Sequence, residues 1–422
     1  MGTLRLRLLA LAGVSALLAS GLSATEPPEV KPAEVRPAVV TLRPLDPSAP
    51  DFQARCVAAA DYSAKHAGRV VLIMHKGRVV FERGDNGWPV DRPHPLASGT
   101  KSFTGVAAMY AVQDGLLTLD ELACDTLTEW KSDPRKSRIT VRQLLTLSSG
   151  LDPSDDLLGG RGGGLLLGPG IGRRGEPQSR DRKDEPGNLF ASAVGVPAVG
   201  EPGSKFEYGP SHFYAFGELL RRKLEKSDLP EKTVQAYYEA RVFKPLGLTF
   251  RVGKDKAGNP KLPGGAVLSA KEWGTFGQFV LQKGAWGKEL GGPEADSGAK
   301  PGPTQLLKAE LLAECFKPSK ANPSYGLTWW LLADSGAGAE ADGPKATGQP
   351  MRDRIRERYF KAESKGIVGP DGKPITVFMA AGLGKQRLYV LPQFDLVVVR
   401  FAESSREGLG FKNDEFLGAL LR

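Results

Sequence analysis

The sequence predicts an α+β fold: an antiparallel sheet of about five strands, flanked by N- and C-terminal helices and interrupted by a large, mainly helical inserted region. Short apolar runs bounded by turn residues cluster near the two ends of the chain, around residues 70–82 and 375–402. Between them, apolar residues recur mostly at helical spacing. Strands grouped apart from helices are typical of an antiparallel sheet with helices packed on it. A cleft between the sheet and the helical region is the expected place for a site.

The composition is that of a globular protein. The chain has 422 residues, of which 41% are hydrophobic and 25% charged, so disorder and collagen are excluded for the chain as a whole. This length suits two or three compact units or one large composite fold. Gly and Pro together form about a fifth of the chain, and this excess is expected in particular stretches. The net charge of +9 permits anionic partners without choosing among them.

The N-terminus has the pattern of a secretory signal peptide. Arg5 and Arg7 form a basic region, residues 8–18 are mostly apolar, and a small-residue stretch allows cleavage after Ala24. The apolar run is shorter than the roughly 20 residues that a spanning helix needs, which favours cleavage over the alternative of an uncleaved anchor. We therefore predict an exported protein, periplasmic or extracellular, with no stable membrane span once residues 1–24 are removed.

A tether and one composite domain are predicted after the signal peptide. Residues 25–50 carry seven prolines and are expected to be extended. The domain is predicted at residues 51–422. Its sheet part is expected at about 51–95 and 375–422, and its helical part at about 96–374.

The individual elements follow from capping residues, apolar spacing and turns. Asp51 is expected to cap the first helix, which Gly68 follows as a stop signal. Lys76-Gly77 is expected to join a hairpin, Pro392–Asp395 to turn the last strand pair, and Asn413 to cap the final helix. The predicted strands cover residues 70–74, 79–82, 375–381, 387–391 and 396–402, and the helices of the middle region cover residues 141–147, 213–224 and 270–282.

Two Gly-rich stretches account for much of the Gly excess. Residues 159–175 hold nine glycines, and Gly170–Gly175 matches the spacing of a dinucleotide-binding loop. No predicted strand precedes this run and Pro177 follows it, so a flexible loop is the better interpretation. The cations of residues 173–183 have no interleaved aromatic residues, so no nucleic-acid partner is expected. The second stretch covers residues 334–348.

The cysteines and histidines do not form a framework. Cys56, Cys124 and Cys315 are widely spaced and odd in number, so at most one intramolecular disulfide can form, and buried unpaired thiols are the alternative. None of the four histidines has the spacing of a zinc motif. No metal or cofactor is therefore expected.

Candidate nucleophiles come from two Ser-x-x-Lys tetrads, since the chain has no Gly-x-Ser-x-Gly elbow. The second tetrad, Ser297 to Lys300, lies among glycines and prolines, whereas Ser98 and Lys101 open a run of helical spacing. On one face of a helix the ammonium can reach the hydroxyl. A lysine whose pKa is lowered by a helix N-terminus can take up the hydroxyl proton. The alternative is a capping serine beside a surface lysine.

Five motifs occur in one order along the chain: Leu96–Lys101, Ile139–Leu151, Pro202–Tyr208, Tyr325–Trp330 and Arg387–Pro392. With them the chain resembles, from about residue 51 to its end, the penicillin-recognising serine hydrolases of the class C type. That family includes class C β-lactamases, D-Ala-D-Ala carboxypeptidases, D-aminopeptidases, family VIII carboxylesterases and 6-aminohexanoate-dimer hydrolase. The resemblance implies the β-lactamase/transpeptidase-like form of the predicted fold.

The resemblance also implies three catalytic residues. Ser98 corresponds to the acylated nucleophile, Lys101 to its base partner, and Tyr208 to the tyrosine of the second motif, which relays the proton to the leaving group. The second motif of the family is usually Tyr-x-Asn, but Pro210 stands here where the asparagine is usual. Ser211, one position further on, is a candidate replacement for the missing amide.

The third motif of the family, Lys-Thr-Gly or His-x-Gly, corresponds to Ala380-Ala-Gly382. By analogy, the N–H groups of Ser98 and Leu383 form the oxyanion hole. Gly382 still allows the acyl group to approach the backbone.

Ala380 lacks the cation that helps to hold a substrate carboxylate in β-lactamases and carboxypeptidases, which favours an ester or a neutral amide as substrate. Lys385 and Arg387 are near enough in the sequence to restore positive charge. Trp329 and Trp330 are candidates to line an acyl pocket, with core packing as the alternative.

The sequence thus predicts an exported serine hydrolase that forms an acyl-enzyme on Ser98 and acts on an ester or amide, as a carboxylesterase or D-amino-acid amidase does. The expected partner is a small-molecule or cell-wall-peptide substrate. One alternative is a β-lactamase or D,D-carboxypeptidase. The other is a non-catalytic cell-wall-binding module, against which the intact Ser98, Lys101 and Tyr208 count.

Overall fold

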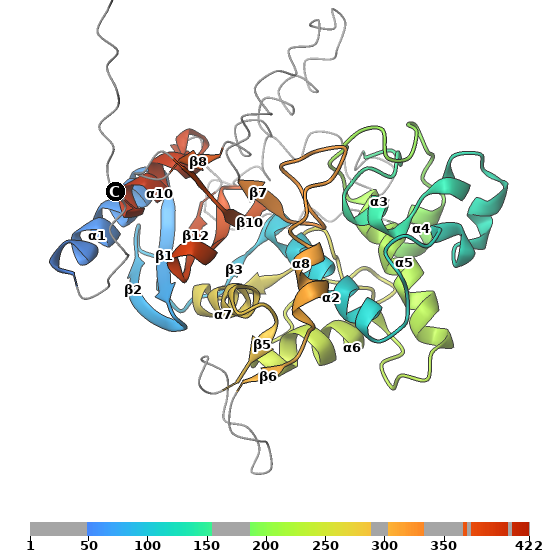
Figure 1. Cartoon of the computed structure of the whole chain (residues 1–422), viewed down its shortest axis with the longest axis horizontal. Helices are drawn as coiled ribbons and strands as arrows, with labels where there is room; N and C mark the ends of the chain where they lie inside the picture. Colours follow the sequence, from blue (N-terminus) through green and yellow to red (C-terminus); the bar gives the residue numbers. More distant parts are fainter. Residues whose placement is uncertain are drawn as a thin grey trace, which may run out of the picture. The chain divides into compact units, whose positions relative to one another are not determined.

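The computed structural model describes residues 49–153, 186–287, 303–332, 366–368, 373–403 and 407–421. The predicted signal peptide, nearly all of the predicted tether, both Gly-rich stretches and the tetrad Ser297 to Lys300 lie outside these residues. Figure 1 shows a central sheet with α1 and α10 on one side and the helical region on the other.

A six-stranded antiparallel sheet forms the centre of the fold, and the two ends of the chain build most of it. The first long strand of the chain pairs with the last one over most of its length, from Val70 opposite Phe401 to His75 opposite Leu396. This pairing confirms the predicted α+β class. In spatial order the strands are β2 (Arg78–Gly84), β1 (Gly68–His75), β12 (Leu396–Ala402), β11 (Gln386–Leu391), β10 (Val377–Gly382) and β7 (Trp330–Leu332).

All five predicted strands are present, and the sheet gains a sixth. The predicted strand 375–381 is divided, because Pro374–Ile375 form the short β9 and Val377–Gly382 form β10. The additional strand, β7, pairs with β10 at the edge of the sheet. It is three residues long and lies in a continuous apolar run, so the sequence shows no alternation of apolar and polar residues that would predict a strand here.

Helices cover both faces of the sheet. α1 (Pro50–Lys65) and α10 (Asn413–Leu421) pack against each other on the face toward which Arg400 points, since Arg400 bonds to Ser63 of α1. α7 (Ala270–Leu281) lies on the opposite face, where Val399 approaches Gly274 of that helix. Neighbouring residues of a strand point to opposite faces, so the sheet is enclosed between these helices.

Two predicted helix caps are corrected by the structure. α1 begins at Pro50, one residue before the predicted cap Asp51, because a proline needs no N–H partner in the first turn. Asp51 lies in that first turn, 3.5 Å from Arg55. The side-chain oxygen of Asn413 accepts hydrogen bonds from Arg387 and Tyr389 of β11.

The helical region lies between β2 and β10 in the sequence and confirms the predicted inserted helices. Thr140 and Ser269 form capping boxes at the starts of α3 (Val141–Leu145) and α7. The other α-helices described in this region are α2 (Lys101–Gln113), α4 (Leu189–Val194), α5 (Ser211–Lys226), α6 (Val234–Tyr238) and α8 (Ala309–Glu314), and further two-residue strands are β3 (His94–Pro95), β4 (Val267–Leu268), β5 (Ala285–Trp286), β6 (Thr304–Gln305) and β8 (Ile367–Val368).

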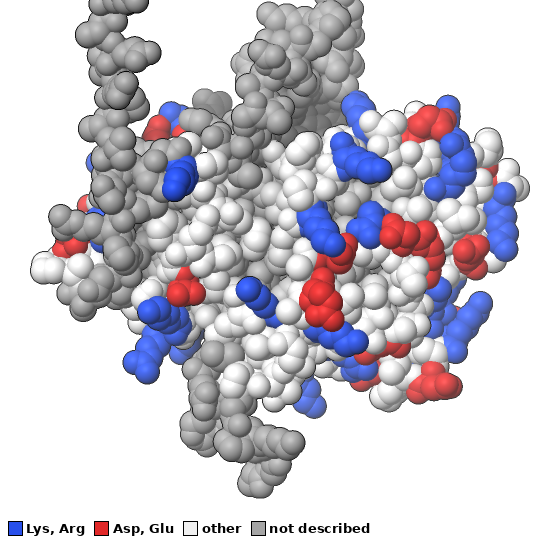
Figure 2. Space-filling model, viewed as in Figure 1, with Lys and Arg blue, Asp and Glu red and all other residues white. Residues whose placement is uncertain are grey.

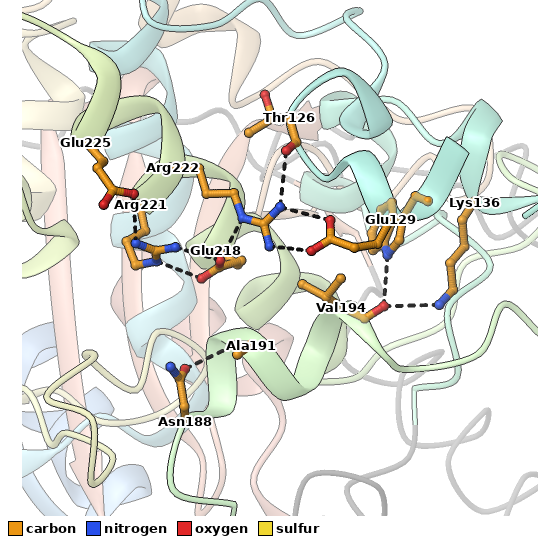
Figure 3. Close-up of polar contacts among 11 residues, drawn as sticks. Thr126, Glu129, Lys136, Asn188, Ala191, Val194, Glu218, Arg221, Arg222 and Glu225 are labelled. Carbon is orange, nitrogen blue, oxygen red and sulfur yellow. Dashed lines mark hydrogen bonds and ion pairs between the residues drawn. The ribbon is translucent and has the colours of Figure 1, made fainter. Parts of the chain in front are cut away.

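Helix α5, which starts three residues after Tyr208, is anchored by charged side chains (Figure 3). Arg222 donates two hydrogen bonds to Glu129 at 2.7 and 2.9 Å and one to Glu218 at 2.8 Å. Burial raises the pKa of the Glu218 carboxyl, but hydrogen bonds from Arg221 and Arg222 outweigh burial and the net pKa is lowered. Arg222, held in place by the ionised Glu218, therefore joins α5 to the turn that contains Glu129.

Charges of both signs are mixed on the molecular surface. Figure 2 shows Lys and Arg side chains beside Asp and Glu side chains over the helical region, without a large area of one sign on this face. Ion pairs of the helical region include Arg142 with Asp120 at 2.7 Å. Among the residues described, none of the helices combines the length and the apolar character needed to cross a membrane.

Candidate active site

Ser98 lies in a 3-10 turn, η1 (Ala97–Thr100), that leads directly into α2. Ala97, immediately before it, has a φ of 47°, a left-handed conformation that costs a non-glycine residue about 1–3 kcal/mol. Hydrogen bonds hold this conformation: the Thr100 hydroxyl donates to the Ala97 carbonyl at 2.7 Å and accepts from the Ala266 N–H at 3.0 Å. The half-buried Ser98 is therefore presented on a rigid, strained turn.

Lys101 sits one turn further on, and its side chain is buried rather than on the surface. Its ammonium donates a 3.0 Å hydrogen bond to Ser98 Oγ and a 2.6 Å hydrogen bond to the carbonyl of Pro263. The two residues thus share one face, as the spacing predicts. The alternative of a surface lysine is wrong, because the Lys101 side chain is buried. Its two hydrogen bonds offset the cost of burying an amine.

Tyr208 is the third predicted residue that the structure brings to this place. Its ring centroid lies 4.9 Å from Lys101 Nζ, and the ring of Phe213 lies 5.2 Å from the same atom. Two aromatic rings therefore pack against the buried Lys101 nitrogen. Ser98 and Lys101 thus form one cluster with Tyr208, which lies more than 100 residues further along the chain.

Aromatic side chains hold the ring of Tyr208. Trp330 stacks on it with centroids 6.0 Å apart and an interplanar angle of 26°, and Tyr325 meets it edge-on at 6.4 Å. Burial, with a smaller effect from Tyr208, raises the pKa of Tyr325 well above its usual value, so Tyr325 stays a neutral packing residue. Trp330 belongs to the site, whereas Trp329 is packed in the core between Phe276 and Phe316.

The backbone before Tyr208 is fixed by a buried histidine that the sequence did not identify. His212 Nε2 donates to the carbonyl of Glu207 at 2.7 Å, and His212 Nδ1 lies 2.8 Å from Ser149 Oγ. The N–H of Glu207 in turn donates to Leu147 at 2.8 Å. Ser149 lies within the motif Ile139–Leu151, but no spacing signal connects it to a histidine 63 residues later. These bonds position Tyr208 against the end of α3.

The departure at Pro210 changes the start of α5. Pro210 occupies the N-cap position of this helix, and Ser211 is its first residue. Ser211 is fully buried, and its hydroxyl has no hydrogen-bond partner among the described residues. The expectation that Ser211 replaces the usual asparagine is wrong, because an enclosed hydroxyl presents no surface to a substrate.

The end of β10 lies against the turn that carries Ser98. A Cβ built on Gly382 would overlap the carbonyl oxygen of Leu96, so glycine is required for this close approach. Ala380 is buried in β10 opposite Leu388, and the half-buried Leu383 follows Gly382 at the start of the β10–β11 turn. The predicted oxyanion and substrate-binding residues of β10 therefore border the Ser98 turn.

The cations near Ala380 do not face a substrate. Arg387 is fully buried and donates to the carbonyls of Gly382 and Gln386. Lys385 is buried as well. The prediction that Lys385 and Arg387 restore positive charge for a substrate carboxylate is not supported, because the Arg387 guanidinium is engaged with the backbone in the interior.

Known proteins resemble this chain in sequence and fold. The sequence profile of the family described as Beta-lactamase matches residues 54–416. A lovastatin esterase of Penicillium rubens is 30% identical over 169 residues, which is 36% of this chain and 38% of the esterase, so well under half of that relative is matched.

Two solved structures share the fold at low sequence identity. One is EstCE1, described as a hydrolase with promiscuous acyltransferase activity, with a TM-score of 0.53, 16% identity, and coverage of 88% of this chain and 98% of that chain. The other is a D-stereospecific amidohydrolase from Streptomyces, with a TM-score of 0.52, 16% identity, and coverage of 84% and 94%.

Proposed function

The chain belongs to the β-lactamase family, a family of serine hydrolases, and from that premise we propose that it is an exported carboxylesterase that forms an acyl-enzyme on Ser98. The observation that carries the proposal is the 3.0 Å hydrogen bond between Lys101 Nζ and Ser98 Oγ, in a buried setting that Tyr208 completes. A nucleophile and its base at hydrogen-bond distance are the requirement for activating a serine hydroxyl.

The acylation step can be written with these residues. Lys101, in its neutral form, takes the proton of the Ser98 hydroxyl as Oγ forms a bond to the acyl carbon. The electron pair of the carbonyl double bond moves to its oxygen, where the N–H groups of Ser98 and Leu383 stabilise the charge. The intermediate then expels the alcohol, which leaves with the proton relayed through Tyr208. Water attacks the acyl-enzyme in the second half, releases the acid and restores the Ser98 hydroxyl.

Three observations favour an uncharged ester. Ala380 carries no cation at the position where the family holds a substrate carboxylate, and Arg387 is turned to the interior. The ring of Tyr208, stacked on Trp330, packs beside Lys101, so apolar rather than charged side chains surround the Ser98–Lys101 pair. The curated relative of Penicillium rubens is named an esterase.

A substrate panel tests the proposal. Wild type and Ser98→Ala are compared on p-nitrophenyl butyrate, nitrocefin and a D-amino-acid amide. Ser102→Ala is the matched control, because it removes the hydroxyl of a nearby serine that donates to the Gly99 carbonyl and has no role in the proposed reaction. We expect the wild type and the control to hydrolyse the ester and Ser98→Ala to be inactive.

Other outcomes overturn the ester assignment. Turnover of nitrocefin or the amide with an inert ester would make the chain a lactamase or an amidase. Binding of peptidoglycan by both wild type and Ser98→Ala, with no hydrolysis of any substrate, would make it a wall-binding module.

Export is proposed from the sequence of residues 1–24. The test is expression of the full chain in a bacterial host with sequencing of the mature N-terminus. A protein that begins at Thr25 supports export with cleavage after Ala24, whereas an intact N-terminus in the cytosolic fraction contradicts it.

A further inference from the structure

The turn between β10 and β11 is held from the interior by side chains. The carbonyls of Gly382, Leu383, Gly384 and Lys385 all accept hydrogen bonds from buried donors. Gln386 Nε2 lies 3.2 Å from the Leu383 carbonyl and 3.4 Å from that of Gly384. Arg400 Nη1 lies 2.8 Å from the Lys385 carbonyl, and Arg387 Nη1 lies 3.2 Å from the Gly382 carbonyl. The carbonyls of turns usually face water. Here four consecutive carbonyls accept hydrogen bonds from buried side chains, which indicates a turn of fixed shape.

The bond from Arg387 fixes one particular peptide plane. The Gly382 carbonyl and the Leu383 N–H belong to the same planar, trans unit and point in opposite directions. With the carbonyl directed at the guanidinium, the Leu383 N–H must face away from it. A cation bonded to the carbonyl oxygen also polarises the peptide, which makes the N–H a stronger donor.

This peptide plane lies next to the nucleophile. Gly382 packs directly on the carbonyl of Leu96, two residues before Ser98. We propose that Arg387 is a positioning residue for the oxyanion hole, which aims and polarises the Leu383 N–H toward the oxygen of an acyl group bound to Ser98. The inference rests on the proposed function, since it requires a tetrahedral intermediate on Ser98.

Arg387 is itself held in place. It is fully buried, and its position on β11 is set by pairing with Ala381 on one side and Arg400 on the other. Its Nε donates to Asn413 Oδ1 at 3.2 Å, and the Tyr389 hydroxyl donates to the same oxygen at 2.7 Å. The first residue of α10 is thereby connected through Arg387 to the oxyanion hole.

The test compares Arg387→Lys with Arg400→Lys. Arg400 is equally buried and lies opposite Arg387, but it holds the turn at the Lys385 carbonyl rather than at the Gly382–Leu383 peptide, so its replacement tests whether loosening the turn elsewhere also affects the oxyanion hole. A lysine keeps the charge and loses the planar fork of donors. Rates are measured on a p-nitrophenyl ester and on its thionoester, per active site titrated with a fluorophosphonate. Sulfur is a poor hydrogen-bond acceptor, so the ester-to-thionoester ratio reports the oxyanion hole.

We expect Arg387→Lys to lower kcat for the ester roughly tenfold, with KM changed little, and to reduce the ester-to-thionoester ratio. Arg400→Lys should lower the melting temperature comparably and keep the wild-type ratio. The inference is overturned if Arg387→Lys keeps the wild-type kcat and ratio, or if Arg400→Lys lowers the ratio as much.

Two further variants separate the possible failures. If Arg387→Lys does not fold, Asn413→Ala removes the acceptor of Arg387 Nε, and a reduced ratio supports the inference while an unchanged one contradicts it. Ser98→Ala is measured in the same series. Activity that survives Ser98→Ala refutes the proposed function itself, whereas an inactive Ser98→Ala beside an unaffected Arg387→Lys refutes the positioning role alone.

Discussion

Tyr208 carries a ring and a hydroxyl whose roles can be separated. The ring packs between Lys101 and Trp330, and Tyr208→Phe preserves this packing. The hydroxyl is the part that can move a proton. We therefore expect Tyr208→Phe to lower kcat for p-nitrophenyl butyrate by about 100-fold or more, with a small change in melting temperature.

Tyr325→Phe is the matched control for this change. The Tyr325 ring lies edge-on to Tyr208, and Tyr325→Phe removes a hydroxyl just as Tyr208→Phe does. The raised pKa of Tyr325 keeps its hydroxyl neutral. We expect its kcat to stay close to that of the wild type. Equal losses in the two variants would show that Tyr208 acts through packing rather than through proton transfer.

The reactive residues of the site were predictable from the sequence, but the contacts that hold them in place were not. Ser98 and Lys101 are three residues apart, so local geometry was enough to place them together. Trp330 reaches Tyr208 from a distant segment, and His212 is held by Ser149, 63 residues earlier, so no local pattern encodes either contact. Ser211 was wrongly predicted to contact substrate. It lies next to the position of the missing asparagine in the sequence, but its side chain is buried.

The contact between β10 and η1 should not tolerate a side chain at Gly382. An added Cβ would overlap the backbone at Leu96, so the strand or the turn must move. We expect Gly382→Ala to lower both kcat and the melting temperature, the latter by the few degrees that 1–3 kcal/mol of strain produces in a domain of this size.

Gly187→Ala is the control for the same chemical change, because a Cβ there meets nothing within 4 Å. It should leave activity and melting temperature close to wild type. Full activity in Gly382→Ala would contradict the close approach of β10 to the Ser98 turn.

The ion pairs of α5 predict a particular acid sensitivity. Hydrogen bonds from Arg222 lower the pKa of Glu129 from 4.5 to about 2. Because this pKa is lower in the folded state, the pair stabilises the fold above about pH 4.5 and loses its contribution as the pH falls toward 2. We expect Glu129→Gln to flatten the fall in melting temperature across this range.

Glu225→Gln is a suitable comparison, since Glu225 pairs with Arg221 of the same helix at 3.2 Å but is largely exposed. Its pH profile should follow that of the wild type. A Glu129→Gln profile identical to wild type would mean that the Arg222 pair adds nothing to stability, as is common for exposed pairs.

The strands were predictable where turns bounded them. Lys76-Gly77 and Pro392–Asp395 turn the chain as expected, and both flank long, paired strands. β7 was missed because its three residues are defined by pairing with β10 rather than by their own pattern. Asn413 was assigned as a cap because of its residue type, whereas its side chain serves Arg387 and Tyr389 in the interior.

At the scale of the whole molecule, the three cysteines are buried and unpaired, which settles the alternative left open by their odd number. Burial raises the pKa of the Cys56 thiol to about 11, and it raises that of Cys315 further. We expect a thiol reagent to titrate no cysteine in the folded protein and all three after unfolding without reductant. Fewer than three thiols in the unfolded protein would reveal a disulfide.

The overall arrangement was predictable because the two chain ends have strand patterns and the middle has helical ones. The composite sheet follows from the pairing of β1 with β12, which joins residues more than 300 apart. Length alone allowed two or three compact units or one large composite fold, and it could not show that the two chain ends fold together. The net charge was a weaker guide to binding partners, since cations and anions are mixed on the face in Figure 2.

Covalent catalysis by Ser98 is tested most directly by the mass of the reacting protein. The protein is mixed briefly with p-nitrophenyl butyrate, quenched in acid and analysed by intact mass spectrometry and peptide mapping. We expect a gain of one butyryl group on the peptide that contains Ser98, absent in Ser98→Ala. A butyryl group on another residue, or turnover by Ser98→Ala at the wild-type rate, would contradict covalent catalysis by Ser98.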